Sequence, residues 1–331
     1  MTKNNKRIII LSVFALLSMV LFLAITINTY WPLVKDLFGT PYLFSSLSKV
    51  LRRRFLQMIA IIVSVVLISL SSLSFQTLTN NRILTPSILG FDAIFVITQT
   101  MLVALFGGLS IYITNDYLNF GVTTIVMVLV IMLMFVAILR KKKNNIILLL
   151  LLGLVISQLA SSMSNFIKVF MNPDDFQNVV SLTNVNINTI NENLVLMSLP
   201  LMVILTILFF REHRYYDVMS LGEDKAINLG VDYNKKANLT LIYITISMAV
   251  STALVGPLSF LGLIVVNSAK ELFKTTKHKT LMFGSSLLAI IILLGGQALL
   301  ELINFKTPVT VIVSLIGGIY LIYILIKENL K

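Results

Sequence analysis

The sequence predicts an all-α, polytopic membrane protein with about ten transmembrane helices and both termini in the cytoplasm. Of the 331 residues, 57% are hydrophobic and 12% are charged, and the mean hydropathy is +0.94. Soluble domains carry about twice that share of charge. A hydrocarbon core of about 30 Å needs about 20 apolar residues per helix, and the chain repeats such stretches from end to end.

The apolar stretches are separated by short polar segments. All are clear except the eighth, which holds Pro257 and Gly262 near its start. We expect transmembrane helices at Ile8–Asn28, Phe55–Phe75, Ile88–Leu109, Val122–Leu139, Ile146–Phe166, Leu194–Phe210, Leu239–Val255, Leu258–Phe273, Leu281–Leu300 and Val309–Ile326. The first stretch follows a short basic tail without a small-residue cleavage site, so we expect a retained helix and not a signal peptide.

The distribution of positive charge predicts the orientation. If the sides alternate from a cytoplasmic amino terminus, most of the 26 Lys and Arg residues fall in cytoplasmic segments, as the positive-inside rule requires. The exceptions are Lys35, Lys49, Arg52, Arg53, Arg54, Lys168 and Lys306. Three consecutive arginines at the outer start of the second span therefore stand out.

Several classes of function are excluded or disfavoured. The chain has no cysteine, and its two histidines, His213 and His278, lie in separate predicted cytoplasmic loops, so we expect no metal site. It has no phosphate-binding G-x-x-x-x-G-K-[ST] loop, so we expect neither ATPase activity nor a directly bound cofactor. The net charge of +12 is explained by topology and anionic membrane lipid, and we expect no binding of nucleic acid.

Acidic residues are scarce in the predicted spans. Asp92 and Glu301 are the acids close to the bilayer. We expect Asp92 to pair inside the helix bundle, with a pore-lining role as the alternative, and Glu301 to lie at the outer interface near Lys306. A secondary transporter needs a coupling-ion site, and a zinc or manganese permease needs histidines or acids near its pathway, so this scarcity disfavours both.

The longest predicted cytoplasmic loop, residues 211–238, contains the most structured polar segment. From Met219 to Leu229 it resembles a short helix, with Gly222 and Gly230 as breaks. A short amphipathic helix in the cytoplasm needs a partner surface. Its mixture of acidic and basic residues is poor for an anionic lipid surface, which leaves a protein partner as the preferred interpretation.

This segment, LGEDKAINLGVDYNKKA, resembles the "LG-x-x-x-A-x-x-LG-V" coupling segment of the iron-siderophore and cobalamin (FecCD-like) permease family of type II ABC importers. In that family the segment docks onto the ATP-binding subunit. The resemblance implies that the ATPase-coupling residues here are Leu221, Gly222, Glu223, Ala226, Leu229 and Gly230.

Three further segments resemble the same family in the expected order. FQTLTNNRILTPSILGFDA, Phe75–Ala93, resembles its "Q-x-x-x-x-N-P-L-A-x-P-x-x-L-G" stretch, and Gly256–His278 resembles its "G-P-I-x-F-x-G-L-x-x-P-H" stretch. The final segment, TPVTVIVSLIGGIYLIYILIK, resembles the close of the family sequence. The Pro-His pair of the family is Val266-Asn267 here, which resembles the branch that serves catecholate siderophores.

The pathway prediction combines these motifs with two helix breaks. Pro86 with Gly90, and Pro257 with Gly262, interrupt two spans at related places, and interrupted helices in membranes face protein or a water-filled cavity. Packing by small residues is the alternative explanation. The predicted translocation-pathway residues are Gln76, Asn81, Pro86, Gly90, Pro257, Gly262 and Asn267.

The resemblance also implies a role for the arginines. In the family, arginines at the outer start of the second span receive acidic residues of the binding protein, in an R-x-x-R pattern that falls near Arg54 and Gln57 here. We therefore expect binding-protein docking at Arg52, Arg53 and Arg54. The alternative is that these side chains only anchor the helix at the membrane interface by snorkelling.

As a whole, the resemblance implies a non-enzymatic permease subunit, residues 1–331 forming one transmembrane domain, in a bacterial plasma membrane. It would import an intact ferric siderophore, with haem, cobalamin or ion-coupled secondary transport as alternatives. The implied partners are a second permease subunit, identical or homologous, two ATP-binding subunits that use ATP and Mg²⁺, an extracellular substrate-binding lipoprotein and membrane lipid.

Overall fold

The structure is a computed structural model, and it describes residues 3–36, 43–139, 146–184, 191–303, 307 and 309–329. Within these ranges the chain is helical and contains no strand, which confirms the predicted all-α fold. Seven helical segments in the described part are long and apolar enough to cross a membrane, and α3 and part of α15 are shorter apolar helices.

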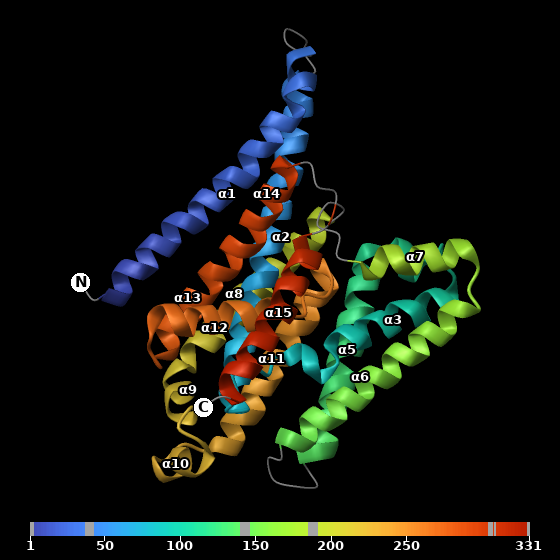
Figure 1. The fold of residues 1–331 in the computed structure, drawn as a ribbon. Coiled ribbons are helices and arrows are strands. Elements are labelled where there is room, and N and C mark those ends of the chain that lie inside the picture. The colour runs from blue at the N-terminus through green and yellow to red at the C-terminus, as the bar shows by residue number, and fades with distance from the viewer. Residues whose placement is uncertain are drawn as a thin grey trace.

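The helices follow one another with short connections (Figure 1). The first half contains α1 (Lys3–Asp36), α2 (Leu43–Leu78), the 3₁₀ turn η1 (Pro86–Leu89), α3 (Phe91–Phe106), α4 (Ile111–Thr114), α5 (Asp116–Leu139), α6 (Ile146–Val169) and α7 (Pro173–Thr183). The second half contains α8 (Glu192–Arg211), α9 (His213–Met219), α10 (Glu223–Asn228), α11 (Tyr233–Val255), α12 (Leu261–Phe273), α13 (His278–Ile290), the π-helical turn η3 (Ile291–Gly295), α14 (Gly296–Leu302) and α15 (Val309–Asn329).

Two helices differ from the prediction in ways that affect the site. The second span begins at Leu43, so α2 has 36 residues, and the three arginines lie inside this helix and not at its start. The doubtful eighth span is α12, whose 13 residues would extend only about 20 Å at 1.5 Å per residue. The apolar cores of the other predicted spans coincide with helices.

Helix α2 is the centre of the larger group of helices, which Figure 1 shows between α8, α11 and α13. Serines along α2 allow close approach: the Ser69 hydroxyl lies 3.0 Å from that of Ser286 on α13, and Ser251 on α11 donates to the Ser64 carbonyl at 3.1 Å. Gly262 of α12 faces Ser72, where a Cβ on the glycine would lie 1.9 Å from the serine oxygen. Small residues hold these helices together, as in other membrane bundles.

A second group consists of α3, α5, α6 and α7, drawn together in the green part of Figure 1. Polar pairs inside it join α3 to its neighbours: Gln99 donates to Asn119 at 2.9 Å on α5, and the Thr100 hydroxyl lies 2.8 Å from Ser164 on α6. Contacts of α11 with α5 and α3 connect this group to the first.

The first helix, α1, and the last, α15, both contact the region of the α12–α13 connection. Arg7, near the start of α1, donates to the carbonyl of Leu272 at the end of α12. Tyr320 of α15 lines the same cavity as His278, the first residue of α13. The α9–α10 segment is at this end too, because Asp217 of α9 contacts His278. This end of the molecule is called the coupling end below.

Candidate functional site

The predicted coupling segment consists of two short helices, α9 and α10, at one end of the bundle (Figure 1). Gly222, at φ +102°, turns the chain between them, and Gly230, at φ +83°, ends the second, and both angles are ones that side chains other than glycine rarely adopt. The helical part of the predicted segment is therefore shorter than Met219–Leu229, since α10 covers only Glu223–Asn228.

The coupling segment presents an apolar surface to its surroundings. Ala226, on the inner side of α10, is fully buried, whereas Leu221 is 52% exposed and Leu229 is 62% exposed. Ile227, between them, is also exposed. Exposed leucines on a short polar segment are typical of a contact surface for another protein.

Helix α9 is anchored to α11 by buried polar contacts. Tyr216 is fully buried and receives a hydrogen bond from Thr240 of α11 at 3.2 Å. Glu212, just before α9, forms an ion pair of 2.6 Å with Lys236 of α11. A force on the coupling segment would therefore act on α11 directly.

A second connection, which we did not predict, joins α9 to α13 and α2. The carboxylate of Asp217 accepts hydrogen bonds from the backbone N–H of His278 at 2.6 Å and from its Nδ1 at 2.8 Å. On the other side of the ring, His278 Nε2 lies 2.7 Å from the hydroxyl of Thr77 on α2. Asp217, His278 and Thr77 are called the relay below.

The carboxylate of Asp217 holds the His278 ring in place. A carboxylate only accepts, so His278 Nδ1 donates to Asp217. The Thr77 hydroxyl donates to the Leu73 carbonyl at 2.9 Å, which holds its oxygen beside His278 Nε2. Burial raises the pKa of Asp217, but the hydrogen bonds and charge of His278 outweigh it and hold that pKa below its usual value.

Three of the predicted pathway residues meet in one cavity at the coupling end. Gln76, Asn81 and Asn267 line a space of about 920 Å³ between α2, α12 and the start of α13. Asn267 donates to the carbonyl of Arg82 at 3.0 Å, which ties α12 to the segment that follows α2. The volume falls within the range of small-molecule sites.

The other four predicted pathway residues lie outside that cavity's lining. Gly262 packs on Ser72, and a Cβ on Gly90 would lie 3.4 Å from the carbonyl oxygen of Gly153 on α6, so both glycines are at helix contacts. Pro86 is buried at the start of η1, and Pro257 is in the connection between α11 and α12.

The two helix breaks approach each other. Ser259, from the break between α11 and α12, donates to Asp92 in the first turn of α3 at 2.5 Å. Asp92 thus pairs inside the bundle, as we predicted, and its other carboxylate oxygen is buried without a partner among the described residues.

The three arginines occupy different environments. Arg54 is buried with its guanidinium 3.7 Å from the centre of the Phe22 ring, and it forms an ion pair with Glu301 on α14. Arg52 is 71% exposed and forms an ion pair of 3.1 Å with Glu192, and Arg53 is exposed. Glu301 is therefore paired with Arg54, and Lys306, its expected neighbour, lies outside the described residues.

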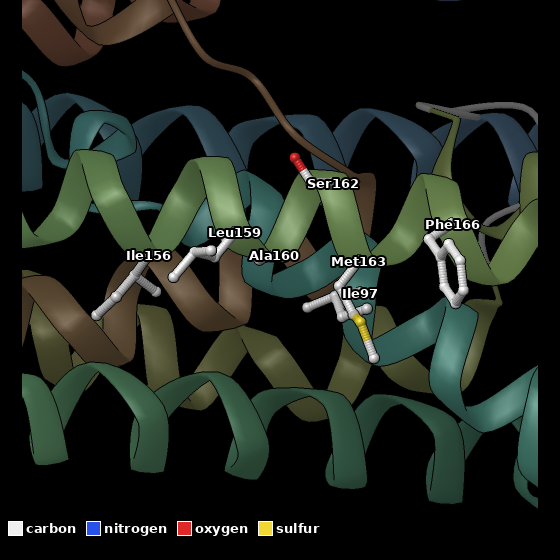
Figure 2. Close-up of a pocket in the computed structure, with 7 residues that line it drawn as sticks. All are labelled: Ile97, Ile156, Leu159, Ala160, Ser162, Met163 and Phe166. Carbon is white, nitrogen blue, oxygen red and sulfur yellow. The ribbon is translucent and has the colours of Figure 1, made fainter.

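An apolar hollow of about 590 Å³ lies on α6. Figure 2 shows its lining, which comes from α6 with a single residue of α3, and in which Ser162 points away from the side that carries Ile156, Leu159 and Met163. The residues are Ile97, Ile156, Leu159, Ala160, Ser162, Met163 and Phe166. Only 11% of the apolar window of α6 is buried, so this face can contact lipid or another protein.

Together, the apolar helices define a multi-pass membrane protein, with the short helices α9 and α10 at one end of the bundle. The model of the FecCD transport family matches residues 8–327, so the chain belongs to that family. A solved structure described as a metal-chelate type ABC transporter in an inward-facing conformation shares the fold, with a TM-score of 0.80, 18% identity and coverage of 98% of this chain and 100% of that one.

Two curated relatives are similar over most of their length. The chain is 40% identical to the petrobactin import system permease protein YclO of Bacillus subtilis (strain 168), over 84% of this chain and 89% of that protein. It is 30% identical to the petrobactin import system permease protein FatC of Bacillus anthracis, over 85% and 79%. The predicted family is confirmed, and the chain is a multi-pass protein of a bacterial membrane.

Proposed function

We propose that the chain is the permease subunit of an ATP-driven importer that carries an intact ferric siderophore into the cell. The family match over residues 8–327, together with 40% identity to a petrobactin permease, carries this proposal. Petrobactin is the preferred cargo, because two relatives that match most of the chain are named for its import. The chain itself is a transport subunit, and its partners hydrolyse ATP.

We assign the coupling segment to the contact with an ATP-binding subunit. Exposed Leu221 and Leu229 provide the apolar contact, and the two glycine turns hold α10 in a fixed orientation. Two ATP-binding subunits, with their ATP and Mg²⁺, would drive the movement. The relay and the Glu212–Lys236 pair then transmit it to α2, α11 and α13.

The proposal places the coupling end in the cytoplasm. Arg7 of α1 and Tyr320 of α15 lie at this end, which supports the proposal of cytoplasmic termini, and the arginines of α2 lie towards the opposite end of that helix. The expectation of about ten spans is retained by counting α3, α12 and α15 with the seven long apolar segments.

At the opposite end, the proposal assigns docking of the extracellular binding lipoprotein to Arg52 and Arg53. Both are exposed, and acidic groups of a partner could reach them. Arg54 instead stabilises the bundle through Glu301 and Phe22. The second permease subunit, identical or homologous, would cover the apolar faces of α6 and α15, and lipid would cover the remaining apolar surface.

Uptake in cells tests the proposal. In a strain that lacks this gene, we expect radiolabelled ferric petrobactin uptake to fall to background and to return when the gene is restored. A panel of other ferric chelates, haem and cobalamin identifies the alternative cargoes. Unchanged uptake of every compound in the deletion strain would contradict the proposal, and uptake abolished by an uncoupler at normal ATP would favour a secondary transporter.

A further inference from the structure

The cavity at the coupling end has an unbalanced charge. Its lining includes the cations Arg82, Lys270 and Lys274 and a single carboxylate, Glu271. His278 also lines it, and the ring nitrogens of that residue are engaged by Asp217 and Thr77. The cavity would therefore attract an anion.

Lys270 is the most informative of these cations. It is partly buried on α12, and its ammonium group donates to the side-chain oxygen of Gln76 at 2.7 Å. Among the residues that the structure describes, no carboxylate lies within ion-pair distance of this ammonium. Burial of a cation without a counter-ion is unfavourable, so a bound anion would stabilise the site.

Gln76 supplies a second donor. An ammonium group can only donate, so the amide atom that faces Lys270 must be Gln76 Oε1, and the amide orientation is fixed. The amide nitrogen, Nε2, is then left without a partner among the described residues, although the side chain is only 2% exposed. A buried amide donor without a protein acceptor can be satisfied by a water molecule or by an oxygen atom of a ligand in the adjacent cavity.

Arg82 stands beside these two groups. Asn267 holds its backbone carbonyl at 3.0 Å, which fixes the turn that follows α2 against α12. Arg82 is exposed and lines the cavity, so its long side chain can reach a ligand there. Charge-assisted hydrogen bonds from guanidinium and ammonium groups are the strong interactions with carboxylate and other anionic oxygens.

We propose that Gln76, Lys270 and Arg82 form an anion-recognition site that binds the negatively charged oxygens of the ferric chelate as it leaves towards the cytoplasm. This inference rests on the proposed import function, and it adds that the cargo carries a negative charge that the permease recognises. A ferric catecholate or carboxylate chelate is anionic, because its ligand oxygens carry more negative charge than iron(III) offsets. A ferric tris-hydroxamate is neutral and lacks this interaction.

The test uses the complete importer, purified with its partners and reconstituted in vesicles, with radiolabelled ferric petrobactin as the cargo. We expect Lys270→Met to lower uptake about tenfold or more, as loss of a charge-assisted hydrogen bond predicts, and Lys270→Arg to stay within about twofold of wild type. Lys279→Met is the matched control, because Lys279 is exposed on α13 and outside the cavity lining, and its uptake should equal wild type.

Gln76→Glu separates recognition from structure. It gives Lys270 a carboxylate partner, so a purely structural role predicts normal or improved folding and normal uptake. The proposal predicts an assembled importer with normal melting temperature and strongly reduced uptake, because the unpaired donor is replaced by a negative charge. Wild-type uptake by both Gln76→Glu and Lys270→Met would overturn it.

Two further results separate a cargo site from a lipid site and from a failure of the import function. If wild type itself transports no ferric chelate, the proposed function fails and not this site alone. A phospholipid headgroup could supply the same anionic oxygens, so the vesicles are prepared with and without phosphatidylglycerol. If the deficit of Lys270→Met disappears in purely phosphatidylcholine vesicles, the site binds lipid and the cargo assignment is overturned.

Discussion

At the scale of residues, three adjacent arginines of α2 illustrate how position on a helix decides the environment of a side chain. Successive residues of an α-helix point about 100° apart, so one of the three faces the bundle while its neighbours face outwards. Arg54 is the one inside, between Phe22 and Glu301. The other two are exposed at the surface, where Arg52 also contacts Glu192.

Arg53 tests the docking proposal. We expect Arg53→Glu to weaken association of the binding protein about tenfold at low salt, and the difference from wild type to shrink as salt is added, because exposed charges are screened. Lys235→Glu, which makes the same charge change on α11 at the coupling end, serves as the control. Equal affinity of Arg53→Glu and Lys235→Glu in a pull-down titration would exclude the docking role.

For Arg54 we expect an effect on the stability of the protein and not on docking. Arg54→Met leaves Glu301 without its cation, and we expect it to reduce the free energy of unfolding by more than about 2 kcal/mol. This figure is lower than the cost of breaking a fully buried ion pair, because solvent partly screens Glu301. The double variant Arg54→Met with Glu301→Gln should recover part of that loss. Thermal unfolding of the purified protein measures both. A melting temperature unchanged by Arg54→Met would show that the pair adds no stability.

At the scale of elements, α2 connects the coupling segment to the rest of the bundle. Its last turn holds Thr77, whose hydroxyl lies 2.7 Å from His278 Nε2, and Asp217 of α9 binds the same histidine. The side chains of α9, α13 and α2 are therefore linked in series. Under the proposed function, this series would carry a movement of α9 to α2 and to the cavity.

Asp217→Asn tests that route. An amide oxygen is neutral and accepts hydrogen bonds more weakly than a carboxylate, so we expect ferric petrobactin uptake to fall about tenfold while the ATPase subunits remain bound and active. Asp174→Asn, at an exposed position of α7 away from the coupling segment, is the matched control and should transport normally. If Asp217→Asn loses ATPase binding together with uptake, the residue maintains the docking surface and does not transmit movement.

Gly262 tests the packing of α12 on α2. We expect Gly262→Ala to lower the melting temperature and the yield of folded protein, because the new Cβ would lie 1.9 Å from the Ser72 oxygen. Gly121→Ala has open space around it and should be neutral. Adding Ser72→Gly to Gly262→Ala should restore stability. A Gly262→Ala protein that is stable but does not transport would instead indicate a pathway role for this glycine.

At the scale of the whole molecule, hydropathy predicted where the helices lie because burial in lipid selects long apolar stretches. The expected helix Leu194–Phe210 corresponds closely to α8, Glu192–Arg211. Hydropathy could not predict helix ends in polar sequence, where backbone hydrogen bonds continue a helix regardless of side-chain type. Hence α2 starts before its arginines, and α11 starts at Tyr233, six residues ahead of the expected Leu239.

The site was predictable only in part. Gln76, Asn81 and Asn267 were found by motif, and the structure brings them to one cavity. The relay was missed because Thr77 and His278 are 201 residues apart, and no periodic pattern relates them. Sequence also left open whether Gly262 faces a pathway or a helix, since both uses favour a small residue.

Transport by the purified system tests the central claim most directly. The permease, with its partner subunits and binding protein, is reconstituted in vesicles, and uptake of radiolabelled ferric petrobactin is measured with and without ATP on the side of the ATP-binding subunits. The account predicts accumulation that requires ATP, Mg²⁺ and the binding protein. Accumulation that proceeds without ATP in response to an ion gradient, or no accumulation of any ferric chelate by a fully assembled complex, would contradict it.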